Sequence, residues 1–310
     1  MVANRGFKFK IIPTREQSLF FDYAFGCARF VYNQTIDFID CSLSYELDIP
    51  KASVCDAVLR NSFPFLKQMD SVALQQERRH AYDAYMRYFK KKASKPVFKA
   101  KHHSRDSYTT VPNHNNIRIE VIDGKTYIRL PKVGFVRIKM HRQLPKDYTI
   151  CEVTVSKYLN RYIVSIIIRY DMAVPTPKTK VSESAICGLD YNQAQMVVSN
   201  VPLPYHSAPK YYLNTMNQLA KLQQRLSHCI KGSNNYNKVQ NKLQKLHRHI
   251  ANQRYDFLHK LSTYIANTYD VVVVEDIDLH KLSTTHHMGR TLMDNGFQLW
   301  CYPYRTRYHR

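Results

Sequence analysis

Residues 185–199 read AICGLDYNQAQMVVS, and residues 271–276 read VVVVED. The first segment holds an apolar run that ends at Asp190, and a second short run over 195–199 predicts a strand that pairs with it. The second segment is an unbroken β-branched run that ends at Glu275, a pattern typical of a strand covered on both faces. Both carboxylates are therefore expected at the carboxyl ends of buried strands, where an open sheet binds its ligands.

The chain between these two segments shows the apolar spacing of helices. Apolar residues recur every three or four positions over 216–226 and again from Val239 through Ile265, and Lys231-Gly232-Ser233-Asn234 interrupts them. This pattern predicts two long helices that pack their apolar stripes on each other.

The first half of the chain predicts a helical and a β-rich region. Apolar residues alternate with lysines over 7–11 as in a half-buried strand, and Thr14 with Gln17 forms a capping box that begins a helix. Helical patterns follow, and five short strand patterns lie between 117 and 170. Together with the first strand they suggest a small β-barrel, and the Pro- and Lys-bearing segment 171–184 marks its boundary.

The charge of the chain indicates its partner. Lysine and arginine number 46 against 24 acidic residues, a formal net charge of +22, while 44% of the 310 residues are hydrophobic, enough to fold. A charge of this size repels itself unless a polyanion offsets it, so we expect a nucleic acid as partner.

Other partners and compartments are disfavoured by composition. The sequence has no run of about 18 uncharged apolar residues, and its first residues carry charge too early for a signal peptide. We therefore expect no membrane partner and a bacterial cytoplasmic, nucleoid-associated location. The seven cysteines form no C-x-x-C pair, so we expect reduced thiols and no zinc.

The basic residues concentrate in the loop 90–105, where Phe98 and Tyr108 are candidate stacking side chains, and on the predicted helical hairpin. Charge runs are usually solvated faces, but one this dense within a folded chain favours contact with phosphates. For the hairpin, a solvated helix pair stays the alternative. The candidate contacts to a nucleic-acid backbone are Lys90, Lys91, Lys92, Lys95, Lys99, Lys101, Arg105, Lys231, Lys238, Lys242, Lys245 and Arg248.

The carboxylates Asp190 and Glu275 do not by themselves establish metal chemistry. A two-metal nuclease needs several convergent carboxylates, because ions about 3.5–4 Å apart must be neutralised and oriented. From spacing alone, the favoured interpretation is that Asp190 lies in a turn and that Glu275 is a solvated strand end.

Five segments, in this order and at this spacing, resemble the TnpB (OrfB) family of insertion-sequence transposons, whose members are similar to the ancestors of type V CRISPR effectors. The segments are FKFKIIPTREQSLFFDYAFGCARFVYN (7–33), KPVFKAKHHSRDSYTT (95–110), CGLDYNQAQMVVSN (187–200), NQRYDFLHKLS (252–262) and VVVVEDIDL (271–279). The resemblance implies an RNA-guided protein, in which base pairing by a guide RNA supplies the sequence and the protein reads a short adjacent duplex motif.

The resemblance also implies an α+β multidomain fold. Residues 1–13 and 103–183 correspond to a wedge-like β-barrel domain, into which the helical recognition domain of residues 14–102 is inserted. Residues 184–310 correspond to an RNase H-like RuvC α/β domain that contains the helical hairpin.

Several residues take expected roles from the family's RuvC domain. Asp190 matches its first catalytic aspartate, and Glu275 matches its catalytic glutamate. Arg254, Asp256 and His259 match a family helix for which we expect structural and RNA-contacting roles.

Recognition of the adjacent DNA motif is assigned in the same way. Gln75 falls where the family reads this motif, and an amide there bonds an adenine edge bidentately. Ser71 lies one helical turn earlier, and Asn113 comes from the barrel side.

The last residues depart from the family. After Asp294-Asn295-Gly296-Phe297, family members continue through a strand, a zinc ribbon and a third catalytic aspartate, whereas this sequence ends in LWCYPYRTRYHR. Without a third ligand, a second metal ion has no seat. We therefore expect a truncated RuvC domain in which Asp190 and Glu275 are remnants, with no catalytic residue and no bound metal.

The leading hypothesis is then a protein that is not an enzyme. It binds a guide RNA and double-stranded target DNA beside the adjacent motif, as one monomer per guide RNA, and represses transcription there. It needs neither zinc nor, for binding, Mg²⁺. The alternatives are an active minimal TnpB-type RNA-guided DNA endonuclease, whose site Asp276 or Asp278 completes, and a decayed transposon fragment.

Overall fold

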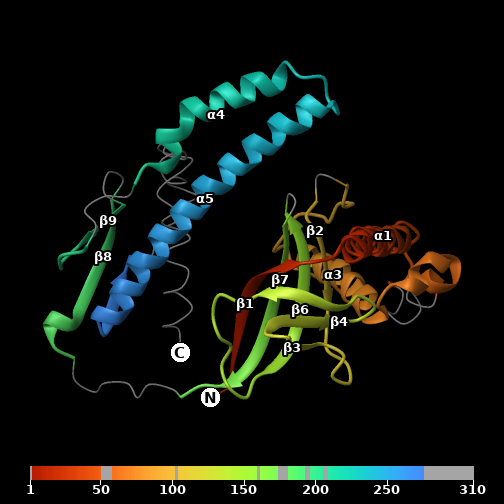
Figure 1. Cartoon of the computed structure of the whole chain (residues 1–310), viewed down its shortest axis with the longest axis horizontal. Helices are drawn as coiled ribbons and strands as arrows, with labels where there is room; N and C mark the ends of the chain where they lie inside the picture. Colours follow the sequence, from red (N-terminus) through yellow and green to blue (C-terminus); the bar gives the residue numbers. More distant parts are fainter. Residues whose placement is uncertain are drawn as a thin grey trace. The chain divides into compact units, whose positions relative to one another are not determined.

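The computed structural model describes seven stretches of the chain in two compact units, residues 1–175 and residues 176–310 (Figure 1). The described stretches are 2–49, 58–101, 104–158, 161–173, 181–192, 196–204 and 209–275.

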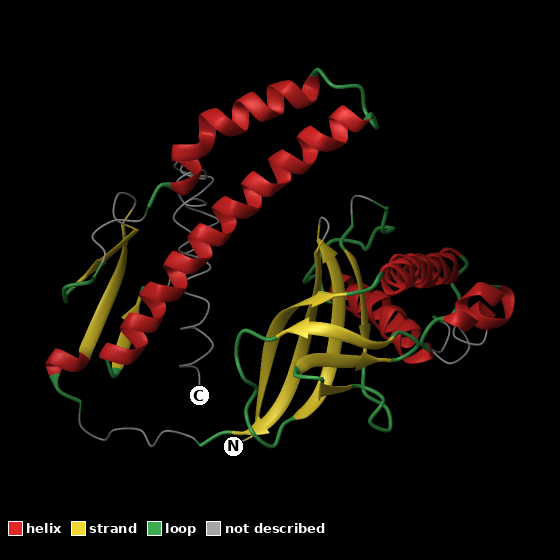
Figure 2. Ribbon diagram, viewed as in Figure 1, coloured by secondary structure: helices red, strands yellow, loops and turns green. Residues whose placement is uncertain are grey.

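A seven-stranded antiparallel sheet frames the first unit (Figure 2). Its strands are β1 (Val2–Ile12), β2 (Asp106–Thr110), β3 (Arg118–Ile122), β4 (Lys125–Leu130), β5 (Gly134–Lys139), β6 (Thr149–Tyr158) and β7 (Arg161–Asp171). They lie in the order β2-β6-β7-β1-β5-β4-β3. The first strand is therefore central, paired with β7 on one side and with β5 on the other.

The local patterns of the sequence account for these strands. Phe7, Phe9 and Ile11 point into the core while the lysines between them stay exposed, as the alternation predicted. The tight turn between β3 and β4 is Asp123-Gly124, where both residues have positive φ. The predicted closure into a barrel is not confirmed, because β2 and β3 are the sheet edges and no pairing joins them within the described residues.

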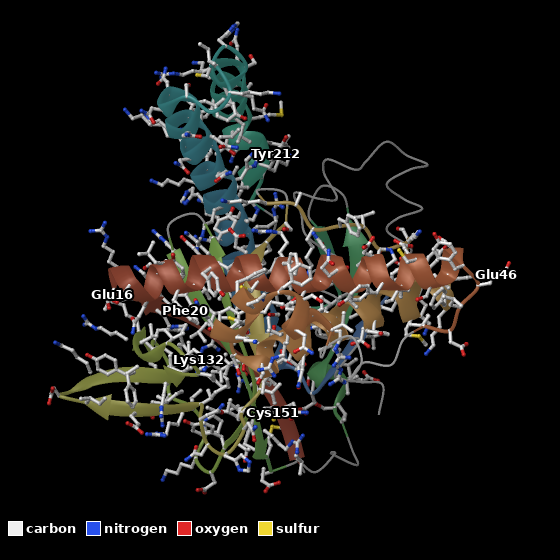
Figure 3. All side chains as sticks on the ribbon, turned by 90° about the vertical axis from the view of Figure 1, so that its right-hand side faces the viewer. Glu16, Phe20, Glu46, Lys132, Cys151 and Tyr212 are labelled. Atoms are coloured by element: carbon white, nitrogen blue, oxygen red, sulfur yellow. The ribbon has the colours of Figure 1, made fainter. Side chains whose placement is uncertain are left out.

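Two helices cover this sheet. Helix α1 (Arg15–Ser44) begins at the predicted capping box, in which the Gln17 N–H donates to Thr14 Oγ1 (3.2 Å) and the Thr14 N–H to Gln17 Oε1 (3.1 Å). Figure 3 shows α1 along its length, from Glu16 to Glu46 beyond its last residue. A helical stretch at 58–62 and the 3₁₀ helix η1 (Pro64–Gln68) precede helix α3 (Ser71–Phe89).

The start of α3 is fastened to the end of β2. Asp70 caps the helix by accepting from the Val72 N–H (3.3 Å), and its other carboxylate oxygen accepts from the Thr110 hydroxyl (2.5 Å). Tyr108 from β2 packs between Phe21 and Phe25 of α1 in the shared core. The helical and β-rich regions of the first unit therefore share one continuous hydrophobic core.

The second unit is a three-stranded sheet with a long helical hairpin. The 3₁₀ helix η2 (Glu183–Ala185) leads into β8 (Ile186–Asn192), which pairs antiparallel with β9 (Met196–Ser199) and parallel with β10 (Val271–Val274). Helices α4 (Tyr211–Ser227) and α5 (Asn234–Thr268) pack on each other, so the predicted hairpin is confirmed (Figure 1).

Helix α5 covers one face of this small sheet. Its residues Phe257, Leu261 and Ile265 form a core with Cys187 and Leu189 of β8. The expectation that the valine strand is covered on both faces is not confirmed, because Val273 is 57% exposed in the described part of the chain. No helix among the described residues has the length and apolarity that a membrane span requires.

Candidate metal centre and nucleic-acid interface

The parallel pair β8 and β10 brings Asp190 and Glu275 to the same sheet edge. Asp190 lies near the end of β8, and Glu275 directly follows β10, where its N–H donates to the Leu189 carbonyl (3.4 Å). Both side chains are exposed and open onto one hollow, which Ser199 and Asn200 also line. The prediction that the carboxyl ends of these strands present two acidic groups together is confirmed.

The two carboxyl groups are close enough to share a hydrogen bond. This hydrogen bond with Asp190 raises the pKa of Glu275 above its usual range, and desolvation and the negative charge of Asp190 act in the same direction. Carboxyl groups this close relieve their repulsion by sharing a proton, and a divalent cation relieves it equally well. The pair therefore fits a hard cation such as Mg²⁺, which binds carboxylate oxygens.

The described residues supply two acidic ligands here and no more. No cluster of three or more metal-binding side chains occurs in the part of the chain that the structure describes. The candidate additional ligands Asp276 and Asp278, and the segment after Phe297 that departs from the family, lie outside the described residues.

Asn200 is a site residue that the sequence did not reveal. Strand β9 ends at Ser199, and the Asn200 side chain continues its hydrogen bonding: Oδ1 accepts from the Gly188 N–H (2.7 Å) and Nδ2 donates to the Ile186 carbonyl (3.3 Å). A side-chain amide carries an acceptor and a donor, as a peptide unit does. The Asn200 amide therefore satisfies the backbone groups of β8 just before Asp190. An asparagine directly after a strand was the available signal.

The basic loop 90–105 divides into anchored and free cations. The Lys95 ammonium binds Asp40 (2.6 Å), and that of Lys99 binds the buried Glu77 (3.3 Å) and lies 3.8 Å from the Tyr32 ring centroid. Asn33 also exchanges two hydrogen bonds with the Lys99 backbone, of 2.7 and 3.0 Å. These contacts hold the loop against α1 and α3.

The remaining cations of the loop also divide into anchored and free side chains. The Arg105 guanidinium donates to the Ser156 hydroxyl (2.9 Å). Lys90, Lys91, Lys92 and Lys101 are exposed and form no ion pair within the described residues. These four are the best placed to contact phosphates.

Of the two predictions of a stacking residue, the one for Tyr108 is wrong. Phe98 is exposed, but Tyr108 is only 2% exposed and is enclosed by the core of α1 and the sheet. Strand β2 buries Tyr108, Thr109 and Thr110 in succession, so the ring of Tyr108 lies in the core although its segment is basic.

The three residues predicted to read the DNA motif lie near the start of α3. Ser71 and the exposed Gln75 line one small hollow next to Arg60, and Asn113 is not among its lining residues. Asn113 is exposed three residues after Thr110, which binds the cap of α3. The structure therefore brings Ser71 and Gln75 together and places the start of the Asn113 loop nearby.

The predicted lysines of the helical hairpin are exposed. Lys238, Lys242 and Lys245 are exposed at successive turns of α5, and Lys231 is exposed in the hairpin turn. Arg248 is half-buried farther along α5.

The residues assigned from the family helix lie farther along α5. Arg254 is half-buried, Asp256 pairs with Lys260 (2.7 Å), and the His259 ring contacts Tyr255 edge to face (4.3 Å between centroids). Asp256 and His259 thus have local partners on the helix itself.

Two family models match the chain. The OrfB_IS605 model, described as "Probable transposase", matches residues 168–286, and the HTH_OrfB_IS605 model, described as "Helix-turn-helix domain", matches residues 1–39. In the structure, the described residues of the second match form strand β1 and most of helix α1.

Named relatives match most of the chain. A "Putative RNA-guided DNA endonuclease" of Streptomyces pristinaespiralis is 29% identical over 94% of this chain and 71% of the relative. "Putative RNA-guided DNA endonuclease InsQ" of Escherichia coli K12 is 27% identical over 90% of this chain and 67% of the relative. A chain in the cryo-EM structure of the Cas12f1-sgRNA-target DNA complex shares the fold, with a TM-score of 0.56 over 96% of this chain and 87% of that chain at 11% identity.

These relatives correct one expectation. The prediction that the protein is not an enzyme is contradicted, because both named relatives are described as endonucleases. With the two family models and the five segments quoted above, they show that the chain is similar to the TnpB (OrfB) family of transposon-encoded proteins.

Proposed function

We propose that this protein binds a guide RNA together with the DNA that the RNA matches, and that Asp190 and Glu275 hold a divalent metal ion used to cleave that DNA. The observation that carries the proposal is the convergence of these two carboxyl groups at the ends of parallel strands β8 and β10. It is supported by the names of the relatives and by the RNA and DNA bound in the structural neighbour.

Different residues of the chain bind the metal ion, position its ligand and contact phosphates. Asp190 and Glu275 bind and orient the ion, which when bound supplies Lewis-acid stabilisation of charge on a phosphate oxygen. Asn200 fixes the strand edge from which Asp190 projects. The free lysines of the loop 90–105 and of α5 neutralise the phosphates of the nucleic acid.

Recognition of DNA beside the guide-matched segment belongs to the start of α3. The exposed Gln75 amide offers a donor and an acceptor, the pattern that pairs with an adenine edge in the major groove. Ser71 at the same hollow and Asn113 in the nearby loop are the accompanying contacts that we propose.

The test is a cleavage assay on the RNA-loaded full chain. Supercoiled plasmid carrying a guide-matched segment is incubated with Mg²⁺ or Mn²⁺, and binding is followed in parallel by gel shift. We expect nicked or linear product with the parent protein and none with Asp190→Asn, while both bind DNA equally. Guide-matched binding without any product from the parent protein would overturn the endonuclease assignment, and the absence of copurifying RNA would overturn the guide-RNA assignment.

A further inference from the structure

The last turn of α3 exposes an aromatic cluster that the proposed function does not use. Tyr85, Tyr88 and Phe89 contact one another, with ring centroids 6.4 Å apart for Tyr85–Tyr88 and 5.7 Å apart for each of the other two pairs. Tyr85 is buried in the helical core, whereas Tyr88 is 38% and Phe89 is 42% exposed. The cluster is thus rooted in the core and reaches the surface.

A shared carboxylate holds this cluster in place. The Tyr85 hydroxyl donates to Asp40 Oδ1 (2.6 Å), and the Lys95 ammonium binds the same oxygen (2.6 Å). Burial by itself raises the pKa of Asp40, but the hydrogen bonds from Lys95 and Tyr85 outweigh it and lower the pKa below its usual range. Asp40 therefore stays ionised and ties α1, α3 and the basic loop together beside the rings.

The chain then turns so that three exposed lysines follow the rings. Lys91 has a left-handed backbone (φ 54°), its N–H donates to the Tyr88 carbonyl (2.8 Å), and the Lys92 N–H donates to the Arg87 carbonyl (2.9 Å). This pair of hydrogen bonds is a Schellman motif, which fixes the direction of the chain after the helix. Lys90, Lys91 and Lys92 thus leave the helix from a defined turn.

We propose that Tyr88 and Phe89 stack against an unpaired base of single-stranded RNA, while Lys90, Lys91 and Lys92 contact the neighbouring phosphates. Aromatic faces flanked by cations bind single strands, because every base has a π-face and every nucleotide carries a negative charge. A duplex keeps its base faces stacked inside, so it gains only the charge contacts.

Charge disfavours a second copy of this chain as the occupant. Three adjacent unpaired lysines would repel a second copy of this chain, which carries a net charge of +22. The proposal rests on the proposed function for the choice of RNA: a guide RNA offers unpaired bases from the outset, whereas target DNA is a duplex until it is opened.

The test measures binding of the full chain to short oligonucleotides without guide or metal, so that it does not depend on cleavage. Three probes of one sequence are compared by fluorescence anisotropy: single-stranded RNA, the corresponding RNA duplex and single-stranded DNA. For the double change Tyr88→Leu with Phe89→Leu, we expect about tenfold weaker binding of single-stranded RNA, within the range for loss of one stacked base. Duplex binding should change less than about twofold.

Two control variants separate stacking from folding and from charge. Phe65→Leu is a matched control, because Phe65 is an equally exposed (41%) phenylalanine that packs with Phe30 and Phe63 away from the three lysines, and it should leave all affinities unchanged. Lys91→Gly relieves the left-handed backbone and removes one cation, so it should raise the melting temperature yet weaken binding of all three probes.

Each outcome decides one point. Equal losses for single-stranded and duplex RNA, or no loss with the double variant, overturn the stacking site. A larger loss for single-stranded DNA than for RNA overturns the choice of RNA in favour of a displaced DNA strand. Failure of the parent protein to bind any RNA overturns the proposed function itself, which distinguishes the two failures.

Discussion

The side-chain amide of Asn200 occupies the place of a strand residue beside Gly188. Its Oδ1 accepts from the Gly188 N–H at 2.7 Å, and its Nδ2 donates to the Ile186 carbonyl. Beyond the end of β9, a side chain rather than the backbone therefore continues the hydrogen bonding to β8. This contact lies at Gly188, two residues before Asp190. Under the proposed function, Asn200 is a positioning residue for the carboxylate of Asp190.

The first prediction follows from this geometry. Asn200→Ala should lower stability by only about 0.5–1.5 kcal/mol, because water reaches the two exposed backbone groups it leaves. Affinity for Mn²⁺ should fall several-fold, since Asp190 loses its support. Titration calorimetry measures the affinity for Mn²⁺, and thermal unfolding measures the stability. Ser199→Ala is the neighbouring control and should leave Mn²⁺ affinity unchanged; equal effects of the two variants would contradict a positioning role.

The second prediction concerns the shared hydrogen bond between Asp190 and Glu275. Replacing Asp190 by Asn removes a negative charge beside Glu275, so stability without metal should rise slightly rather than fall. Mg²⁺ or Mn²⁺ should raise the melting temperature of the parent protein, as expected for a ligand that binds the folded state, and should not raise that of the variant. A variant that is still stabilised by Mn²⁺ would show that the ion binds elsewhere.

The third prediction concerns pH. The hydrogen bond to Glu77 raises the pKa of His80 above its ordinary value; burial and Lys99 oppose this, and the charges of Glu77 and Glu152 add to it. Because the folded state holds this proton more tightly, the added stability is complete below the unfolded pKa of about 6.5 and is lost as the pH rises through the folded value.

The measurement is the stability difference between the parent protein and His80→Gln across pH. His80 is partly exposed, so we expect a difference of about 1 kcal/mol or less that is larger at pH 6 than at pH 8. A difference that grows with rising pH would mean that His80 is not paired with Glu77 as the structure has it.

The fourth prediction separates cations that are alike in sequence. Lys92 is free to contact a phosphate, whereas Lys95 must first leave Asp40. Lys92→Gln should lower the slope of log affinity against log salt by just under one, the value for one lost phosphate contact, and Lys95→Gln should lower it by much less. Equal slopes for the two variants would show that the Asp40 contact opens on binding.

The fifth prediction concerns the DNA motif. Gln75→Ala should reduce discrimination at one motif position by about 1–3 kcal/mol, because a bidentate amide contact with a base edge is lost. Lys92→Gln serves as the comparison, since loss of a phosphate contact weakens matched and mismatched motifs alike. If Gln75→Ala also weakens both motifs equally, the amide does not read a base.

Local patterns in the sequence were sufficient for most elements. The strands of the first unit after residue 117, the Asp123-Gly124 turn and the capping box of Thr14 and Gln17 each depend on a few adjacent residues, and each is confirmed. The order of strands could not be predicted. The pairing of β1 with β7 depends on contacts such as Phe7 with Ile166, and no local pattern records them.

In the candidate site, too, local sequence patterns predicted some residues and missed others. Asp190 and Glu275 were predicted together because both follow apolar strand patterns. Asn200 was missed because its role depends on where β9 stops. The anchoring of Lys95 by Asp40 joins residues 55 positions apart, which charge density in the sequence does not reveal.

The central place of β1 has a consequence for synthesis on the ribosome. Its partner β7 begins at Arg161, so Phe7 and Phe9, which pair only with β7, wait for their pairing strand while the intervening residues are made. At about 5–20 residues per second, this delay lasts roughly 8–30 seconds. During that interval an apolar strand edge is available to chaperones and to other nascent chains, so slower translation of this segment should increase aggregation rather than improve folding.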